Sequence, residues 1–579
     1  MVNIPARKRT RAITRFIGLA VLLTVLNGAA QSFLFRIDLT GDRRYTLADA
    51  SKRVMQQLDN TVQVYVFLDG PMSLQLKKLR STIKETLDEL KVYAGARLRY
   101  EFVDISADAG ARELPQVYAS LQARGLFPVT EEERTAGGGR SERTVFPGAL
   151  VVYTHTADTA VRTREIAVNF LQDNSGANSD ESLLAARQNV EPALTGAIAR
   201  IARTALPRIA FIEGHGELDE YETGDICRAL SPFTLLDRVE INEDLHALDP
   251  YTAVVIAKPS AAWSDADKLA LDQYIMHGGR VAWFIDAVEV HHDSLANGFN
   301  TLAFACAHGL DDQLFRYGVR INPVIIQDLQ CAMLPVNIAP AGQTADFKPA
   351  PWTYYPLLIP PPDNAITRGL NLILSKYPGT VDTVGKNPAV ARKHLLYSSE
   401  YSRTQAVPAL VSLSQTMQRP DPAAFRQPFL PVAVTLEGSF TSAFLNRPLQ
   451  YYNRQKPFDF KETGEPSKMI VVADGDIIRN DVVRRPDGTR IFPLGFDRYM
   501  NVQFGNGSFV KNCIYYLLDD ENTMQIRPRE WQMRLLDKGE ITQRRTRWTI
   551  LNTLLPIALA LLPGGAFLYF RKRRYATRK

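Results

Sequence analysis

Apolar and polar positions between residues 60 and 205 follow a pattern that predicts strands separated by helices. The stretch VQVYVFL (62–68) is typical of a strand, and residues 72–93 carry apolar side chains at helical spacing. Gly95 follows and can cap that helix, and a second strand is expected over 98–103. A strand, a helix and a strand in this order predict an α/β domain.

The rest of this first part is expected to hold helices over 107–126 and 183–205 and hairpin strands over 149–153 and 163–168. Residues 131–143 are charged and glycine-rich, which indicates a loop or a hairpin tip. Thr46 and Asp49 have the spacing of a capping box and predict the start of a short helix.

The alternation of strands and helices resumes at Pro207. We expect strands over 208–214, 238–241, 252–259 and 280–286, with helices over 226–236 and from Ser264 to Gly278. Continuous apolar strands of this kind are typical of a parallel sheet that is covered on both faces. Later strands over 432–438 and 469–476 are expected to extend this sheet, and a helix is expected over 506–518.

Two uncharged apolar segments, 16–35 and 549–570, are each long enough to cross a membrane as a helix. The basic residues concentrate beside them, in 1–15 and 571–579, which predicts that both termini lie in the cytoplasm and the main body outside. A cleaved signal peptide is the alternative for the first segment, since Gly28-Ala29-Ala30 resembles a cleavage site.

These patterns divide the chain into a basic N-terminus, two membrane helices, two outer α/β domains and a basic tail. The boundaries are 1–15, 16–35, 36–205, 206–525, a juxtamembrane segment 526–548, 549–570 and 571–579. A proline- and aromatic-rich segment, 335–362, is expected to be a long connection or edge excursion inside the second domain.

The formal charge of +6 belongs to the two ends, and the middle of the chain is mildly acidic. This distribution argues against a nucleic-acid-binding protein. The four cysteines lack the spacing of a zinc site; Cys306 and Cys331 could pair, or all four are buried thiols.

Candidate functional residues follow the apolar strands. Gly214, His215, Gly216 and Glu217 end the first strand of the second part, where open α/β sheets bind ligands. Asp286 ends another strand, and Asp474 and Asp476 follow a third. We interpret these residues as turns that shape a recognition surface, rather than as a catalytic or metal site.

Two enzyme signatures are missing from the sequence. There is no G-x-x-x-x-G-K-[ST] phosphate loop, so any ATPase must be a separate subunit. No serine or cysteine follows the strand at 280–286, where a nucleophile elbow would place it. We therefore expect no catalytic residue and no cofactor.

Several blocks in order carry a resemblance to a known family. They are FRIDLTGDRRYTL (35–47), FIEGHGEL (211–218), YGVRINPVIIQDLQC (317–331), PWTYYPLL (351–358), VAVTLEGSFTSAF (432–444), VVADGDIIRN (471–480) and PLGFDRYMNVQFGN (493–506). With these blocks the chain resembles the gliding-motility-associated ABC-transporter auxiliary proteins, the GldG-like substrate-binding subunits.

The resemblance implies two Rossmann-like or amidotransferase-like α/β domains without catalytic residues. It also implies a two-pass protein of the bacterial inner membrane with its main domain in the periplasm. Its expected partners are an ABC-2-type permease and a separate P-loop ATPase, in a transporter that can serve gliding. Two alternatives stay open: a periplasmic metal-dependent hydrolase that uses His215, Glu217 and the cluster at 291–293, or an envelope scaffold.

Overall fold

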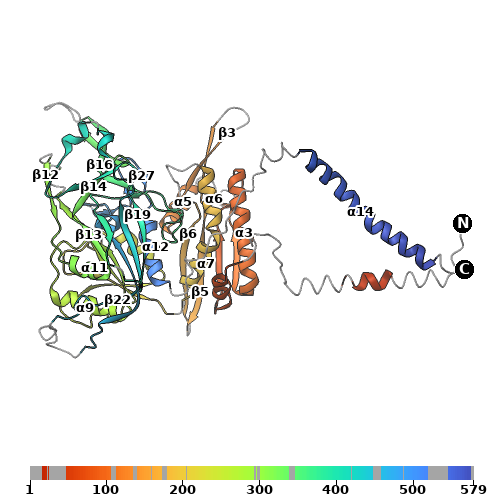
Figure 1. Ribbon diagram of the computed structural model, residues 1–579, viewed down its shortest axis with the longest axis horizontal. Coiled ribbons are helices and arrows are strands. Elements are labelled where there is room, and N and C mark those ends of the chain that lie inside the picture. The colour runs from red at the N-terminus through yellow and green to blue at the C-terminus, as the bar shows by residue number, and fades with distance from the viewer. Residues whose placement is uncertain are drawn as a thin grey trace. The chain divides into compact units, whose positions relative to one another are not determined.

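The computed structural model describes residues 16–22, 24, 47–105, 113–134, 140–157, 160–171, 179–203, 205–291, 295, 300–337, 346–385, 387–418, 420–447, 458–486, 488–519 and 545–575. Residues Met1–Arg529 form one compact unit, and Glu530–Lys579 form a second. The fold is mixed α/β with several sheets, as Figure 1 shows.

A four-stranded sheet of order β2-β1-β5-β6 organises the N-terminal part of the first unit. Its strands are β1 (Val62–Val66), β2 (Leu98–Phe102), β5 (Gly148–Ala157) and β6 (Ala160–Asn169). β1 and β2 are parallel and joined by α3 (Leu74–Ala94), and β5 and β6 form a hairpin beside β1. The predicted β-α-β unit and the predicted hairpin are confirmed.

Helices α2 (Asp49–Gln56), α6 (Ser179–Gln188) and α7 (Val190–Ile201) accompany α3, and α5 (Leu114–Ala123) follows β2. The single helix expected over 183–205 is wrong, because the chain starts a new helix after Asn189. Pro192 explains the break, since it lacks an N–H and its ring would clash with the carbonyl of residue 188 in a continuous helix.

Other expectations for this part have mixed outcomes. α2 does begin at Asp49, but its N-cap is Ala48, whose N–H donates to Glu191 Oε1 at 2.8 Å; Thr46 lies outside the described residues. The charged stretch over 131–143 belongs to a hairpin of β3 (Val129–Arg134) and β4 (Arg140–Val145), whose connection is not described.

A seven-stranded sheet of order β19-β22-β23-β10-β9-β7-β8 organises the rest of the unit. Its strands are β7 (Arg208–Glu213), β8 (Leu235–Glu240), β9 (Ala253–Ala257), β10 (Arg280–Phe284), β19 (Val390–Tyr397), β22 (Pro431–Thr441) and β23 (Thr463–Val472). The strands from β23 to β8 run parallel to one another. β22 is antiparallel to β23, and β19 is antiparallel to β22. The late strands therefore extend the second sheet, as predicted.

Helices cover both faces of this sheet, which explains why every residue of β9 is buried. α9 (Asp265–Met276) and α11 (Asp311–Tyr317) contact β22, whereas α12 (Asn506–Leu518) contacts β10 and α8 (Gly224–Leu230). In Figure 1, α9 and α11 lie on one side of β22 and α12 on the other. α8 ends earlier than predicted because Leu235 already donates to Pro207 O and joins the sheet.

Short sheets surround the large one. They are built from β11 (Val288–Val290), β12 (Asn300–Ala305), β13 (Val319–Asn322), β14 (Val324–Asp328), β15 (Cys331–Asn337), β16 (Phe347–Leu358), β17 (Ile373–Leu374), β18 (Thr380–Thr383), β20 (Ser402–Ala406), β21 (Ala409–Ser412), β24 (Val482–Arg485), β25 (Gly488–Ile491), β26 (Phe496–Asp497) and β27 (Val502–Gln503). Of the two alternatives expected for 335–362, the long connection is wrong, since β15 and β16 form a hairpin; this hairpin lies outside the seven-stranded sheet, so the edge excursion is not contradicted. Trp352, Tyr354 and Leu358 alternate inward along β16, a strand pattern that the prolines of this segment obscure.

The second unit contains α14 (Arg545–Tyr575). Its stretch Thr549–Arg573 is the one helix among the described residues that is long and apolar enough to cross a membrane. Of the first expected span, only residues 16–22 and 24 are described, and they are helical. The remainder of that span lies outside the described residues.

Candidate functional site at the carboxyl edge of the large sheet

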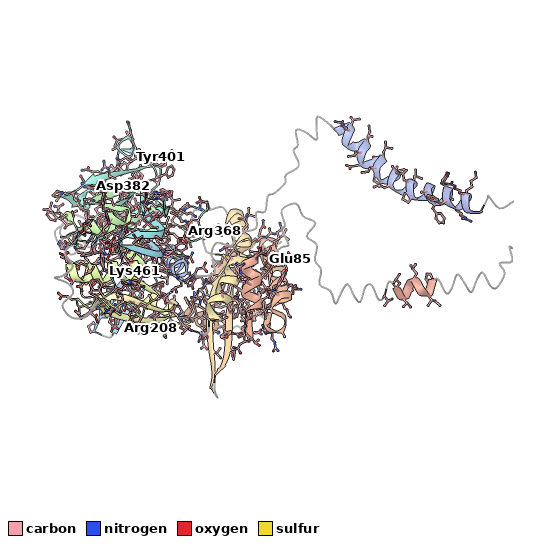
Figure 2. All side chains as sticks on the ribbon, turned by 60° about the horizontal axis from the view of Figure 1, so that its bottom comes forward. Glu85, Arg208, Arg368, Asp382, Tyr401 and Lys461 are labelled. Carbon is pink, nitrogen blue, oxygen red and sulfur yellow. The ribbon has the colours of Figure 1, made fainter. Side chains whose placement is uncertain are left out.

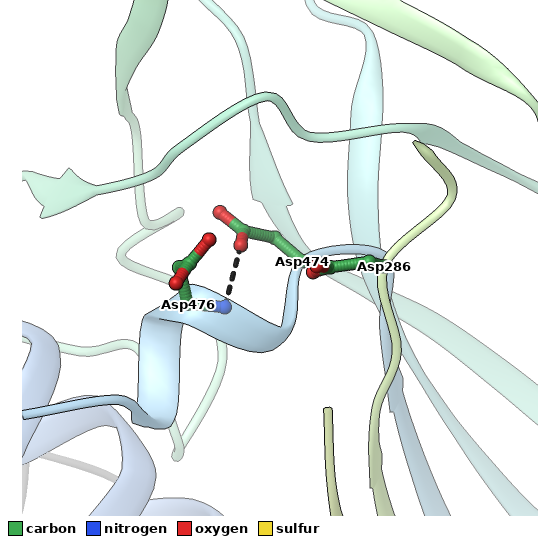
Figure 3. A group of neighbouring side chains, drawn as sticks. All are labelled: Asp286, Asp474 and Asp476. Atoms are coloured by element: carbon green, nitrogen blue, oxygen red, sulfur yellow. Dashed lines mark hydrogen bonds between the residues drawn. The ribbon is translucent and has the colours of Figure 1, made fainter. Parts of the chain in front are cut away.

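Four charged side chains meet where neighbouring parallel strands of the large sheet end. Lys258 follows β9, Asp286 comes shortly after β10, and Asp474 and Asp476 come shortly after β23. The strand order β23-β10-β9 brings these three chain segments side by side. Figure 3 shows the three aspartates together at this edge; we call them, with Lys258, the edge cluster.

Lys258 lies between two of the carboxylates. Its Nζ is 2.8 Å from Asp286 Oδ2 and 2.6 Å from Asp476 Oδ2. Asp286 Oδ1 accepts the N–H of Gly475 at 2.6 Å, so its two oxygens have separate partners. The ammonium therefore neutralises part of a concentrated negative charge from inside the protein.

Asp474 is held by hydroxyl and backbone donors instead of a cation. Its Oδ2 accepts the hydroxyl of Ser375 and the N–H of Lys376 at 2.8 Å, and its Oδ1 accepts the N–H of Asp476 at 2.8 Å. The last bond, dashed in Figure 3, makes Asp474 the N-cap of a short 3-10 helix, η5 (Gly475–Ile478). The cap fixes Asp476 and Gly475 above the strand ends.

The local environment separates the acidities of the three carboxyl groups. Burial, together with the nearby Asp476 and Asp286, raises the pKa of Asp474 to about 7. Burial also raises the pKa of Asp286. At Asp476 burial acts the same way, but Lys258 outweighs it and holds the pKa well below its usual range. The cluster therefore contains one firmly ionised carboxylate, paired with one firmly protonated lysine.

The backbone at the cluster leaves little freedom for substitution. A Cβ on residue 475 would lie 2.6 Å from Lys258 Cβ and 3.0 Å from Asp286 Oδ1, so only glycine fits without a shift. Lys258 itself adopts a φ of +55°, which is uncommon for a residue with a side chain. Such strain persists only where the surroundings over-determine it, here by two ion pairs.

The three aspartates have the composition of a metal site, since one oxygen from each lies within 4.8 Å of the others. Carboxylate oxygens suit hard divalent cations. However, Lys258 already supplies positive charge to Asp286 and Asp476. A metal ion would have to displace that ammonium, so we interpret the edge cluster as an internally neutralised network.

His215 belongs to a second, separate cluster after β7. Its Nε2 lies 3.1 Å from Asp267 Oδ2, its Nδ1 lies 3.3 Å from Glu217 Oε1, and its ring stacks on Trp263 with centroids 4.1 Å apart. Burial alone would lower the pKa of His215, but the bonds to Asp267 and Glu217 outweigh it and raise the pKa to about 9. The imidazole is therefore charged at neutral pH and ties the turn to the start of α9.

Gly214 and Gly216 make this turn possible. Their φ angles are +109° and +75°, and a Cβ on residue 216 would lie 2.2 Å from Ser260 Oγ. The turn closes against the chain after β9, because Ser260 and Ala261 both donate to His215 O. The glycine backbone is exposed, whereas the side chains of His215 and Glu217 are buried.

The structure thus divides the residues that the sequence singled out. Asp286, Asp474 and Asp476 come together, whereas His215 and Glu217 join a different set of partners. Of the cluster at 291–293, His291 lies 3.5 Å from Glu289 at an exposed position, and the other two residues lie outside the described part of the chain. The role of these residues in recognition stays a prediction.

Sequence reasoning missed Lys258 and Arg479. Arg479 lies 2.8 Å from Glu222 and 3.5 Å from Asp476, and so connects the edge cluster to the loop that follows β7. Lys258 had a usable signal: it directly follows a continuous apolar strand, the same position that drew attention to Asp286. Arg479 had none, because the partner Glu222 is distant in sequence.

Different parts of the chain match different protein families. Residues 41–152 match a family described as a domain of unknown function. No curated protein matches the chain. Among solved structures, the mmIFT52 N-terminal domain is 11% identical, with 54% of this chain and 97% of that chain covered and a TM-score of 0.30.

Residues 206–513, more than half of the chain, match the auxiliary family described as "ABC-type uncharacterized transport system". The matched range contains the whole seven-stranded sheet and both charged clusters at its carboxyl edge. The chain therefore belongs to this family of ABC-type transport-system auxiliary proteins.

Proposed function

We propose that the protein is a non-enzymatic, membrane-anchored subunit of an ABC-2-type transporter, with a separate permease and a separate ATPase as partners. The family match over residues 206–513 carries this proposal. The missing phosphate loop supports a partner ATPase, because ATP hydrolysis must then be supplied by another chain.

The proposed topology has two spans, with both termini in the cytoplasm and the main domain in the bacterial periplasm. Thr549–Arg573 supports the second span, and the cluster Arg571, Lys572 and Arg573 at its end supports a cytoplasmic C-terminus. Residues 16–35 supply the first span in this proposal. The outer region then comprises two α/β domains divided near residue 205, and the parallel strands from β23 to β8 support a Rossmann-like assignment for the second.

Within this subunit, we assign partner recognition to the carboxyl edge of the large sheet. The exposed elements there include the glycine backbone of 214 and 216 and the neighbouring Tyr221, which is 40% exposed. The charged side chains beneath are paired with one another, which supports a role in holding the loops rather than in chemistry.

A metal-dependent hydrolase is the competing function, and the geometry of its expected ligands argues against it. Both ring nitrogens of His215 face carboxylates, and Lys258 occupies the charge-neutralising position among the aspartates. A hydrolase would require at least one of these sets to release its internal partner before a metal ion could bind.

The test is purification of the full-length, tagged protein in mild detergent, with the co-purifying proteins identified by mass spectrometry. We expect a polytopic permease and a P-loop ATPase, with both reduced in Tyr221→Ser protein and unchanged in Tyr401→Ser, whose side chain is also exposed at 54%. A purified protein with neither partner and with stoichiometric bound metal would favour the hydrolase. The permease alone, unaffected by ATPase deletion, would favour a scaffold.

If the transporter is assembled as proposed, surface gliding is one process that it can serve. Deletion of the gene in its native host, followed by measurement of cell movement on a surface, tests that role separately from complex formation.

A further inference from the structure

A cavity of about 160 Å³ lies against α7 and α12 within the first unit, away from the edge cluster. Its walls include Arg200 on α7, Arg368 on the segment before β17, and Lys511 on α12. Figure 2 labels Arg368 at the border between the part built on the large sheet and the part built on the four-stranded sheet. The three basic side chains come from distant positions in the sequence.

The charged side chains that line the cavity are all basic. Among the described residues that line the cavity there are three cationic side chains and no aspartate or glutamate. The other polar lining residues are Asn169, Ser182, Asn189, Ser508, Asn512 and Tyr515. Amide and hydroxyl groups can donate hydrogen bonds, so the wall combines positive charge with neutral donors.

Among the described residues, Arg200 and Lys511 have few internal partners. Arg200 stacks over the ring of Tyr515 at 3.7 Å, and its buried Nε has no hydrogen-bond partner. In the part of the chain that the structure describes, the Lys511 ammonium makes no hydrogen bond or ion pair. Burial and then Arg200 lower the pKa of Lys511 to about 8, against a smaller opposing effect of Asp225.

Leaving positive charge in a partly buried wall is unfavourable unless a counter-charge is nearby. The edge cluster shows how the same fold compensates a buried cation, since Lys258 has two carboxylates within 2.8 Å. Among the described residues Lys511 has no such ion pair, and only the smaller effect of Asp225 opposes the cost of its burial. An anion from solution would supply that compensation.

We propose that this cavity binds a small tetrahedral oxyanion of the size of phosphate or sulfate, with Lys511, Arg200 and Arg368 as its cationic ligands. The volume is large enough for such an ion. Guanidinium and ammonium groups are the side chains that bind oxyanions most strongly. The proposal does not rest on the transporter function.

The test uses full-length protein in a neutral detergent and sulfate as the probe, because sulfate does not titrate near neutral pH. Melting temperature is measured as sulfate replaces chloride at constant ionic strength. Specific binding gives a curved rise that becomes logarithmic in sulfate concentration above the Kd. General exclusion of sulfate from protein surfaces gives a rise that is linear and the same in every variant.

We expect Lys511→Met to move this curved response to sulfate concentrations about tenfold higher or more, since it removes a charge-assisted bond. The same substitution should raise the melting temperature without sulfate, because it removes an uncompensated charge. Lys511→Arg should keep the response, and Lys393→Met, an exposed lysine on β19, should leave it unchanged.

Parallel, linear responses in the wild-type protein and Lys511→Met would overturn the proposal. Should Lys511→Met fail to fold, the same series on Arg368→Gln decides in the same way. Repeating the titration in nanodiscs with and without phosphatidylglycerol identifies the source of the oxyanion. An apparent sulfate Kd that is raised by the anionic lipid assigns it to a headgroup, and an unchanged apparent Kd assigns it to a free ion.

Discussion

Replacing Lys258 with methionine tests whether the edge cluster is neutralised from inside the protein. The substitution keeps the length of the side chain and removes its charge. Asp286 and Asp476 would then face each other without the ammonium that lies 2.8 Å and 2.6 Å from their oxygens. Their side chains are only 17% and 5% exposed, so water can replace little of the lost interaction.

The expected cost follows from this burial. Removing one partner of a buried ion pair destabilises a protein by about 3–5 kcal/mol, because a charge is left without compensation. The Lys258 side chain is 21% exposed, which places the expected loss near the lower end, at about 3 kcal/mol. At about 2 °C per kcal/mol for a large domain, the melting temperature should fall by about 6 °C.

How the stability of Lys258→Met depends on pH and on divalent cations distinguishes the loss of the charge from the loss of packing. With Lys258 removed, protonation of the carboxylates should recover stability as the pH is lowered from 7 to 5, and Lys258→Met/Asp476→Asn should be more stable than Lys258→Met. The three aspartates, no longer held by an internal cation, should also gain stability from Mn²⁺ or Ca²⁺, which should leave the wild-type protein unchanged.

The assay is thermal denaturation of the full-length protein in detergent, with Lys393→Met as the matched control. That lysine is exposed on β19, so its loss should change the free energy of unfolding by less than about 0.5 kcal/mol. The reasoning is refuted if Lys258→Met is as stable as the control at neutral pH. It is also refuted if the lower stability of Lys258→Met is recovered neither by lowering the pH nor by adding Asp476→Asn.

Three further expectations concern pH and the glycine turn. The pKa of His215 is raised to about 9 from 6.5, so the stability it contributes is present below pH 6.5 and is lost as the pH rises through 9; the melting-temperature gap between wild type and His215→Gln should close in that range. The pKa of Asp474 is raised to about 7 from 3.8, so the folded protein holds an extra proton and stability should fall from pH 4 to 7, a slope that Asp474→Asn should remove. Gly216→Ala should cost about 1–3 kcal/mol in thermal denaturation, because its φ is +75° and its Cβ would meet Ser260 Oγ; Ser260→Gly should recover part of this.

Elements with strong periodicity could be predicted from the sequence. α12 occupies Asn506–Leu518 as its apolar spacing indicates, and Ser264 caps α9 through the N–H of Asp267 at 3.1 Å. Predictions failed at prolines, which either interrupt a helix or lie within an edge strand. Pro192 divides one expected helix into two, and the prolines near Trp352 hide a strand that alternates as strands should.

The sequence predicted where the candidate site residues lie along the chain, but not which of them come together. Each of Asp286, Asp474 and His215 was found because it follows an apolar strand, a rule that needs only the local pattern. Which of them meet depends on strand order, and β23 enters the sheet beside β10 although 178 residues separate Phe284 from Thr463 along the chain. Partners such as Ser375 for Asp474 come from peripheral segments whose placement no local pattern reveals.

The chemistry of the carboxyl edge bears on how it could recognise a partner. Arg479 bonds Glu222, and the N–H of Asn480 donates to Glu222 O at 2.6 Å, so the turn after β23 and the loop after β7 are tied together. A loop already held in one arrangement loses less conformational entropy when it binds than a loose one does. Charges that neutralise one another inside the fold would therefore contribute to binding indirectly, by fixing the exposed glycine backbone. On this reasoning, breaking the bond between Arg479 and Glu222 should weaken partner binding more than it lowers stability, whereas a catalytic edge would lose activity without losing its partner.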